Sequence, residues 1–264
     1  MGYIYLEDIN LLPNETSKIP TPPDLDTHWQ HNKTNPTHQN LDQQLITYAS
    51  HWGTPYGYKQ EQKGDIVQNL FPIKKHETEQ ISSSSKVTLE KHTEAAFHPY
   101  KPDYVTLYCL RDNPHAGTTI SHLEDILPQL TPRTIGWLKE TNYTIGIDTS
   151  FGTTTTRQTI SVLNEDATQL TYDATLLEGN TTDAKNALYY LAQAARKCED
   201  TIYLKQGQAL TFHNHTAIHG RTPYQARHDG TDRWLKRILT TQRTPIAPDY
   251  YLNAQGHPVI TTEF

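Results

Sequence analysis

His92 and Glu94 have the residue types and the spacing to hold a metal ion. They stand two residues apart in a segment, residues 82–94, that is predicted to be extended. In a strand, residues i and i+2 share a face, so an imidazole and a carboxylate can reach one ion. One more histidine would complete a two-histidine, one-carboxylate triad, which leaves positions open on a non-haem Fe(II) for a co-substrate and oxygen. The alternative is two ordinary exposed strand residues.

Three histidines that follow a predicted strand are candidates for the third ligand. His213 and His215 alternate with Phe212 and Asn214, so each can also be read as a residue on a sheet face. His219 precedes Gly220, where the chain must turn, and such a position suits a ligand at the mouth of a barrel. Spacing alone leaves all three histidines open.

Arg233 and Arg237 form a second candidate group. They are four residues apart, so in a strand they point to the same face. Two guanidinium groups aimed at one pocket suit two carboxylates, each held through two hydrogen bonds. The alternative is a pair of surface arginines.

Many short strands and few helices must position these residues. Strands are predicted at residues 3–6, 56–62, 66–72, 82–94, 104–110, 159–163, 169–172, 202–204, 208–213 and 233–241. Helices are predicted at residues 41–52, 122–130, 132–140 and from residue 182, with Thr181 or Thr182 as the cap of the last, and residues 27–40 are expected to be an exposed loop. The pattern predicts one α+β, β-rich domain over residues 1–264, with a sandwich or jelly-roll core and flanking helices.

Composition excludes several classes of function. The net charge is -6, with 23 Lys+Arg against 29 Asp+Glu and no basic run, so no nucleic-acid partner is expected and a small molecule is favoured. Cys109 and Cys198 are the only cysteines, which suits a reducing cytoplasm. No export signal is visible and no apolar run approaches the roughly 20 residues that span a bilayer, so a soluble cytoplasmic protein is expected.

Several stretches carry a resemblance to a known family. They are residues 57–62 (GYKQEQ), 82–86, 92–105 (HTEAAFHPYKPDYV), 109–111 (CLR), 170–173 (LTYD), 219–224 (HGRTPY) and 229–237 (DGTDRWLKR). The chain resembles the clavaminate synthase-like family of Fe(II)/2-oxoglutarate oxygenases, and within it the hydroxylases of free arginine, asparagine and lysine. The resemblance implies a double-stranded β-helix, or jelly roll, and Fe(II), 2-oxoglutarate and O2 as cofactor and co-substrates.

The resemblance also implies roles for the candidate residues. His92, Glu94 and His219 match the iron ligands. Arg233 matches the arginine that clamps the distal carboxylate of 2-oxoglutarate, and Thr119 matches the threonine beside it, with Thr118 close enough in alignment to be an alternative.

Further matches concern the substrate. Arg237 occupies the position that binds the α-carboxylate of an amino acid, and Glu94 can also accept a hydrogen bond from the α-amino group. Asp173, Gln60, Gln62 and Ser82 are expected to line the substrate pocket. Gln60, Gln62 and Ser82 can instead serve only to satisfy backbone groups.

The sequence therefore predicts a hydroxylase, of the kind used in natural-product biosynthesis, acting on an unactivated C–H bond of a free amino acid. Asp173 modestly favours a basic substrate, arginine or lysine. Desaturation or cyclisation stays open, and so does a non-catalytic jelly-roll protein that binds a small acid. Halogenases of this superfamily lack the carboxylate ligand, so Glu94 argues against halogenation. The usual longer helical N-terminal segment is missing, and the oligomeric state is left open.

Overall fold

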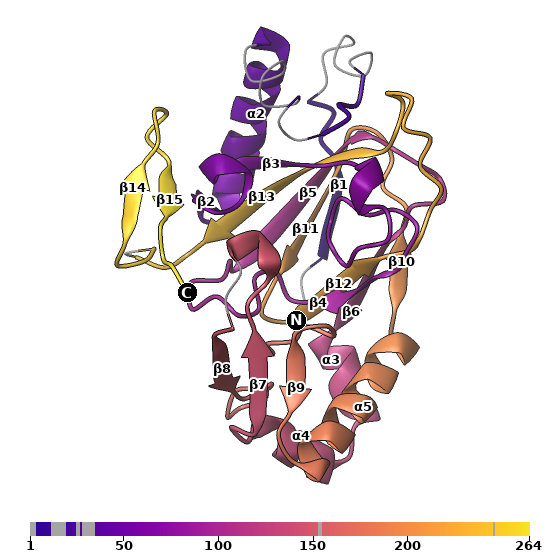
Figure 1. Ribbon diagram of the computed structural model, residues 1–264, viewed down its shortest axis with the longest axis vertical. Helices are drawn as coiled ribbons and strands as arrows, with labels where there is room; N and C mark the ends of the chain where they lie inside the picture. The colour runs from indigo at the N-terminus through magenta and orange to yellow at the C-terminus, as the bar shows by residue number, and fades with distance from the viewer. Residues whose placement is uncertain (1–3, 12–19, 25–26, 28–34, 153–154, 245) are drawn as a thin grey trace.

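The central strands come from two runs rich in β-branched and aromatic residues. β5 (Tyr104–Arg111) and β13 (Trp234–Thr241) pair antiparallel along most of their length. They lie in the middle of the larger sheet in the computed structural model, which describes residues 4–11, 20–24, 27, 35–152, 155–244 and 246–264 (Figure 1). The strand order is β1-β11-β5-β13-β2-β15-β14, and β3 also pairs with β13. The other strands are β1 (Ile4–Asp8), β2 (Thr54–Tyr58), β3 (Val67–Leu70), β11 (Gln208–His213), β14 (Tyr250–Leu252) and β15 (Pro258–Ile260).

A smaller sheet carries most of the predicted metal site. Its order is β10-β6-β12-β4, from β4 (Leu89–His92), β6 (Thr118–His122), β10 (Asp200–Ile202) and β12 (Ala217–Arg221). Leu107 and Leu235 of the larger sheet share a core with Ile120 of the smaller one. The two sheets therefore face each other across a common apolar interior.

The other face of the larger sheet is covered by helix α2 (Pro36–Ala49). Leu41 and Leu45 of α2 pack in a second core with Trp234 and Ile238. These two residues alternate along β13 with Leu235, so one strand serves two cores, as the two-residue period of a strand requires. Short 3-10 helices η2 (Ser50–Trp52), η3 (Gln62–Gly64) and η4 (Lys74–His76) lie in the connections around this sheet.

A third sheet and three helices form the lower part of Figure 1. The sheet has the order β8-β7-β9, from β7 (Tyr143–Gly146), β8 (Arg157–Ile160) and β9 (Leu177–Gly179). The helices are α3 (Leu123–Ile126), α4 (Pro132–Lys139) and α5 (Thr182–Lys197), with η5 (Leu127–Gln129) and η6 (Thr149–Phe151). Thr181 caps α5 by accepting from Ala184 N, which confirms one of the two predicted caps. Within the described residues, no helix is both long and apolar enough to cross a bilayer.

Several predicted elements differ from the structure in their bounds or in their type. The strand predicted at residues 82–94 is confined to Leu89–His92, so Glu94 lies in the turn that follows, where Ala95 has φ +49°. Residues 169–172 form no strand, and only Leu170 among them makes an isolated bridge, to Leu163. The predicted loop at 27–40 contains the start of α2, because Asn35 accepts from Thr37 N as the cap and Pro36 takes the first turn. Residues 28–34 and Tyr3, also covered by predictions, lie outside the described residues.

Candidate metal centre and adjoining cavity

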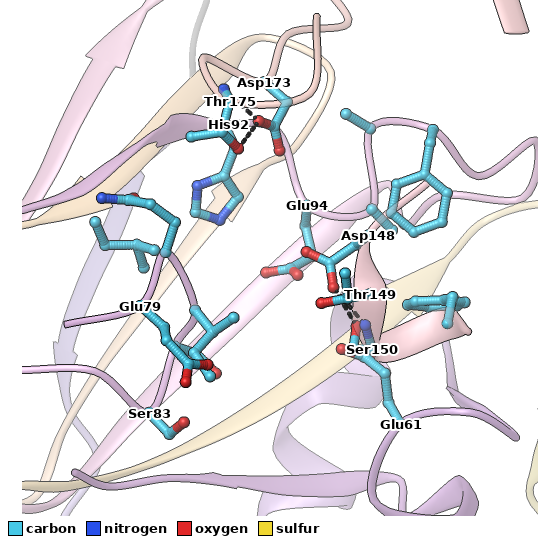
Figure 2. Close-up of a pocket in the computed structure, with 18 of the residues that line it drawn as sticks. Glu61, Glu79, Ser83, His92, Glu94, Asp148, Thr149, Ser150, Asp173 and Thr175 are labelled. Carbon is cyan, nitrogen blue, oxygen red and sulfur yellow. Dashed lines mark hydrogen bonds between the residues drawn. The ribbon is translucent and has the colours of Figure 1, made fainter. Parts of the chain in front are cut away.

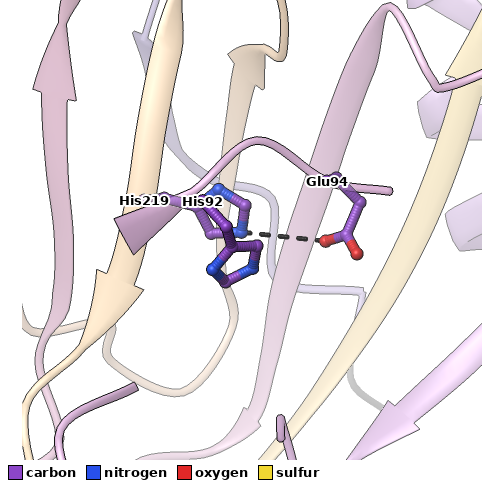
Figure 3. A group of neighbouring side chains, drawn as sticks. All are labelled: His92, Glu94 and His219. Atoms are coloured by element: carbon purple, nitrogen blue, oxygen red, sulfur yellow. Dashed lines mark ion pairs between the residues drawn. The ribbon is translucent and has the colours of Figure 1, made fainter. Parts of the chain in front are cut away.

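The structure brings His92, Glu94 and His219 together. His92 is the last residue of β4, and His219 lies directly opposite it on β12. One ligand atom from each of the three residues lies within 4.8 Å of the others, and Nε2 of His219 is 3.7 Å from Oε2 of Glu94 (Figure 3). This donor set, two imidazoles and one carboxylate, fits a divalent iron ion with open positions.

The other two histidine candidates face elsewhere. His215 Nε2 lies 2.9 Å from a carboxylate oxygen of Asp103, and His213 Nδ1 lies 3.2 Å from the Thr216 hydroxyl. Strand pairing selects His219, because His92 and His219 occupy opposite positions of adjacent strands.

Hydrogen bonds to neighbouring groups orient the triad. His92 Nδ1 lies 2.8 Å from the carbonyl oxygen of Glu90. A carbonyl only accepts, so Nδ1 carries the proton and Nε2 is left with its lone pair for a metal. Asn214 fixes the backbone of Glu94, because its Oδ1 accepts from Glu94 N at 2.7 Å and its Nδ2 donates to Glu94 O at 3.1 Å.

The protonation states suit metal binding. Burial raises the pKa of Glu94, but the charge of Arg237 and contacts with His219 and His92 outweigh burial and lower the pKa below its ordinary value. Burial, together with the charge of His92, lowers the pKa of His219 to about 4, although Glu94 opposes the shift. At neutral pH the triad therefore presents a carboxylate and a neutral imidazole, the forms that bind metals.

Arg237 has partners that the sequence did not predict. Its Nη1 donates to Glu94 Oε1 at 2.6 Å, its Nε donates to Gln68 Oε1 at 2.7 Å, and its Nη2 donates to Glu61 Oε1 at 3.0 Å. Gln68 Nε2 in turn donates to Glu61 Oε2 at 3.0 Å. Gln68 lies on β3, opposite Arg237 on β13, and this relationship is visible only once strand pairing is known. Glu61 belongs to the motif at residues 57–62, which the sequence had already marked.

Arg233, like Arg237, is a buried cation, but its surroundings differ. Its side chain is 7% exposed, and among the described residues no carboxylate pairs with it. Its one hydrogen bond to the part of the chain that the structure describes goes from Nη2 to the Thr118 hydroxyl at 3.4 Å. Four residues of strand correspond to about 13 Å, so Arg233 and Arg237 cannot hold the same end of one ligand. An unpaired guanidinium in the interior indicates that an anionic ligand binds there.

Thr118, and not Thr119, lies beside Arg233, which corrects the sequence prediction. Neighbouring strand residues face opposite ways. Ser121, on the same face of β6 as Thr119, donates to Ala195 O of α5. Thr119 lines a separate cavity of about 570 Å³ whose walls include Arg196 of α5.

A cavity of about 460 Å³ adjoins the triad (Figure 2). Its walls include His92 and all the predicted substrate residues, which are Gln60, Gln62, Ser82, Glu94, Asp173 and Arg237. Both amide atoms of Gln62 bind the backbone of Asn69, so this side chain has a structural use as well. The cavity does not include Arg233 or His219 among its lining residues.

Acidic side chains dominate the charge of this cavity. Six carboxylates line it, from Glu61, Glu79, Glu90, Glu94, Asp148 and Asp173, and Arg237 is its one arginine. Asp148 was missed because it lies in a loop with no pattern to mark it. Asp148 and Asp173 each use Oδ1 to cap their own turns, at Ser150 N and Thr175 N, and Oδ2 of each makes no hydrogen bond within the described residues.

Most of the chain is similar to known dioxygenases. The profile described as "Taurine catabolism dioxygenase TauD, TfdA family" matches residues 38–239. L-lysine 3-hydroxylase from Catenulispora acidiphila is 32% identical over 194 residues, which make up 70% of this chain and 54% of that protein. The chain thus spans about half the length of this relative.

Solved structures are similar over most of the chain. Asparagine oxygenase in complex with Fe(II), 2S,3S-3-hydroxyasparagine and succinate has a TM-score of 0.84 and 26% identity, covering 98% of this chain and 80% of that one. The non-heme iron oxygenase OrfP in complex with Fe and alpha-ketoglutaric acid has a TM-score of 0.79 and 32% identity, covering 91% and 75%. A variant of OrfP has also been solved with (3S)-hydroxy-L-Arg.

Proposed function

Because the chain belongs to the TauD, TfdA family of dioxygenases, we propose that it is an Fe(II)/2-oxoglutarate-dependent hydroxylase of a free basic amino acid. The observation that carries the proposal is an acid-lined cavity directly beside a His-Glu-His triad. The two facing sheets are proposed to form the expected jelly-roll core, in one domain.

Each co-substrate has residues suited to hold it. His92, Glu94 and His219 would bind the iron. Arg233, buried without a carboxylate partner, would hold the distal carboxylate of 2-oxoglutarate, with the Thr118 hydroxyl beside it. When bound, iron, 2-oxoglutarate and O2 supply the oxidant that replaces a C–H bond by C–OH, with release of succinate and CO2. The protein's own contribution is to hold the amino acid so that one carbon faces the metal.

The charge of the cavity favours a cationic substrate. Arg237 would bind the α-carboxylate at one end through the charge of a guanidinium group that its partners in the wall already hold in place. Elsewhere in the cavity wall, Asp173 and Asp148 each offer a carboxylate oxygen that has no partner among the described residues. These two oxygens suit the side-chain cation of lysine or arginine, and the lysine 3-hydroxylase and the OrfP complex with hydroxylated arginine support the same class.

The test combines spectroscopy with a substrate panel. Purified protein under anaerobic conditions should develop a visible charge-transfer band on addition of Fe(II) and 2-oxoglutarate, and His219→Ala should not. With oxygen, the amino acids are compared by succinate formation and by mass. Gain of one oxygen atom by lysine or arginine is expected. Loss of two hydrogens would instead identify a desaturase or cyclase, and no succinate with any amino acid would favour a binding protein.

A further inference from the structure

Residues 261–264 run beside the cavity and contact two of its walls. β15 pairs in parallel with β2, with Ile260 opposite Tyr58, and Lys59 N donates to Ile260 O at 2.9 Å. The chain after β15 therefore continues alongside the residues that follow β2, which include Gln60 of the cavity wall. In Figure 1 the C-terminal end lies below the β14–β15 hairpin, toward the sheet of β7, β8 and β9.

The first contact fixes the side-chain amide of Gln60. Its Nε2 donates to the carbonyl oxygen of Thr262 at 2.6 Å. A carbonyl only accepts, so the amide nitrogen must face Thr262 and the amide oxygen must point the other way. That oxygen, Oε1, is buried and has no hydrogen-bond partner among the described residues. A buried acceptor without a donor is destabilising, so a ligand in the cavity is expected to supply one.

The second contact is with an aromatic cluster that also lines the cavity. The ring of Phe264 lies 5.5 Å from that of Phe97 and 6.3 Å from that of Phe151, centroid to centroid and nearly edge-on. Phe97 and Phe151 line the cavity. Phe151 ends η6, the turn whose N-cap is Asp148, so Phe264 packs against the segment that carries this carboxylate.

We propose that residues 261–264 form a positioning segment that sets the substrate specificity of the cavity. Thr262 presents the Gln60 oxygen as an acceptor, and Phe264 holds the Asp148 turn within reach of the same ligand. The class of ligand is a cation with several N–H donors, such as the distal end of lysine or arginine. The identity of this ligand rests on the proposed function, whereas the packing of Phe264 against Phe151 does not.

Three variants test the proposal. Phe264→Ala removes the ring, Phe264→Leu restores apolar bulk, and Glu263→Ala is the matched control, because Glu263 makes only an exposed ion pair with Lys59 at 3.4 Å. Hydrogen exchange of the peptide covering residues 146–152 is measured on the ligand-free proteins, and thermal unfolding checks that all three are folded. Steady-state kinetics with the preferred amino acid then separate KM from kcat.

Faster exchange at residues 146–152 is expected in Phe264→Ala alone. Its KM for the amino acid should rise roughly 10- to 100-fold, the weight of one hydrogen bond between charged groups, with unchanged binding of 2-oxoglutarate and recovery in Phe264→Leu. Unchanged exchange and unchanged KM in Phe264→Ala would overturn the proposal, as would equal effects in Glu263→Ala. Wild-type protein that turns over no amino acid would refute the proposed function, and the exchange comparison would still decide whether Phe264 holds the turn.

Discussion

Arg237 Nη1 donates a hydrogen bond to Oε1 of Glu94 at 2.6 Å, while Oε2 of the same carboxylate lies 3.7 Å from His219 Nε2. The two oxygens of Glu94 therefore face two different neighbours. One oxygen is available to a metal held by the histidines, and the other joins the metal centre to the arginine of the adjoining cavity. This link gives the carboxylate a role in both the metal site and the substrate site.

The two buried arginines are expected to serve different ligands. Arg237→Lys should raise KM for the amino acid about 10- to 100-fold, because lysine cannot reproduce the hydrogen bonds that fix the guanidinium group in the cavity wall. Arg233→Lys should instead weaken the binding of 2-oxoglutarate by a similar factor. Anaerobic titration of the charge-transfer band measures the second effect, and initial rates measure the first. If both variants weakened the binding of the same ligand, the expectation that the two arginines serve different ligands would be contradicted.

Adjacent threonines provide an internal control for the 2-oxoglutarate site. Thr118→Val should raise the Kd of 2-oxoglutarate about three- to tenfold, since the substitution deletes the hydroxyl beside Arg233 and keeps the volume of the side chain. Thr119→Val, one residue along and facing the other way, should leave that Kd unchanged. A larger effect at Thr119 would restore the assignment suggested by the sequence resemblance.

A buried ion pair attaches α2 to the larger sheet. Lys236 is fully buried, and its Nζ donates to Asp42 Oδ1 at 2.6 Å and to Asn69 Oδ1 at 3.2 Å. Asp42→Leu leaves the lysine charge buried without its carboxylate, so a loss of about 3–5 kcal/mol in the free energy of unfolding is expected. Lys236→Met combined with Asp42→Leu should recover most of this loss. Urea denaturation measures both single variants, Asp42→Leu and Lys236→Met, and the double variant, and additive single effects would argue against the coupling.

Asp103 gives the stability of the fold a specific pH dependence. Burial raises its pKa, but hydrogen bonds from His215, Gln242 N and the Thr241 hydroxyl lower it below the ordinary range. A carboxyl whose folded pKa is depressed stabilises the fold above its unfolded pKa of about 3.9, and this contribution disappears as the pH falls through the folded pKa. Asp103→Asn should therefore cost about 1–3 kcal/mol at pH 7.

The difference between Asp103→Asn and wild type should shrink as the pH is lowered below about 4, because the carboxyl of the unfolded chain then takes up a proton while the folded carboxyl is still ionised. Chemical denaturation at several pH values measures this difference. Asp249→Asn, at an exposed position with no side-chain hydrogen bond among the described residues, is the control and should follow wild type. A constant difference across the range would show that the charge of Asp103 is not what stabilises the fold.

The sequence by itself determined the donor types and the local geometry. His92 and Glu94, two residues apart, reach one site even though the strand ends at His92. The α5 helix was predictable because its cap and its apolar spacing are local signals. Local pattern also placed Arg233 and Arg237 on a strand, although the strand begins only after Arg233.

Tertiary structure decided every choice that depends on which strands pair. His219 was chosen over His213 and His215 because β12 places it opposite His92. Thr118, and not Thr119, contacts Arg233, because only one face of β6 is directed toward that arginine. The partners of Arg237, Gln68 and Glu61, come from separate segments that β3–β13 pairing brings together. Such contacts join residues far apart along the chain, and no local period in the sequence encodes them.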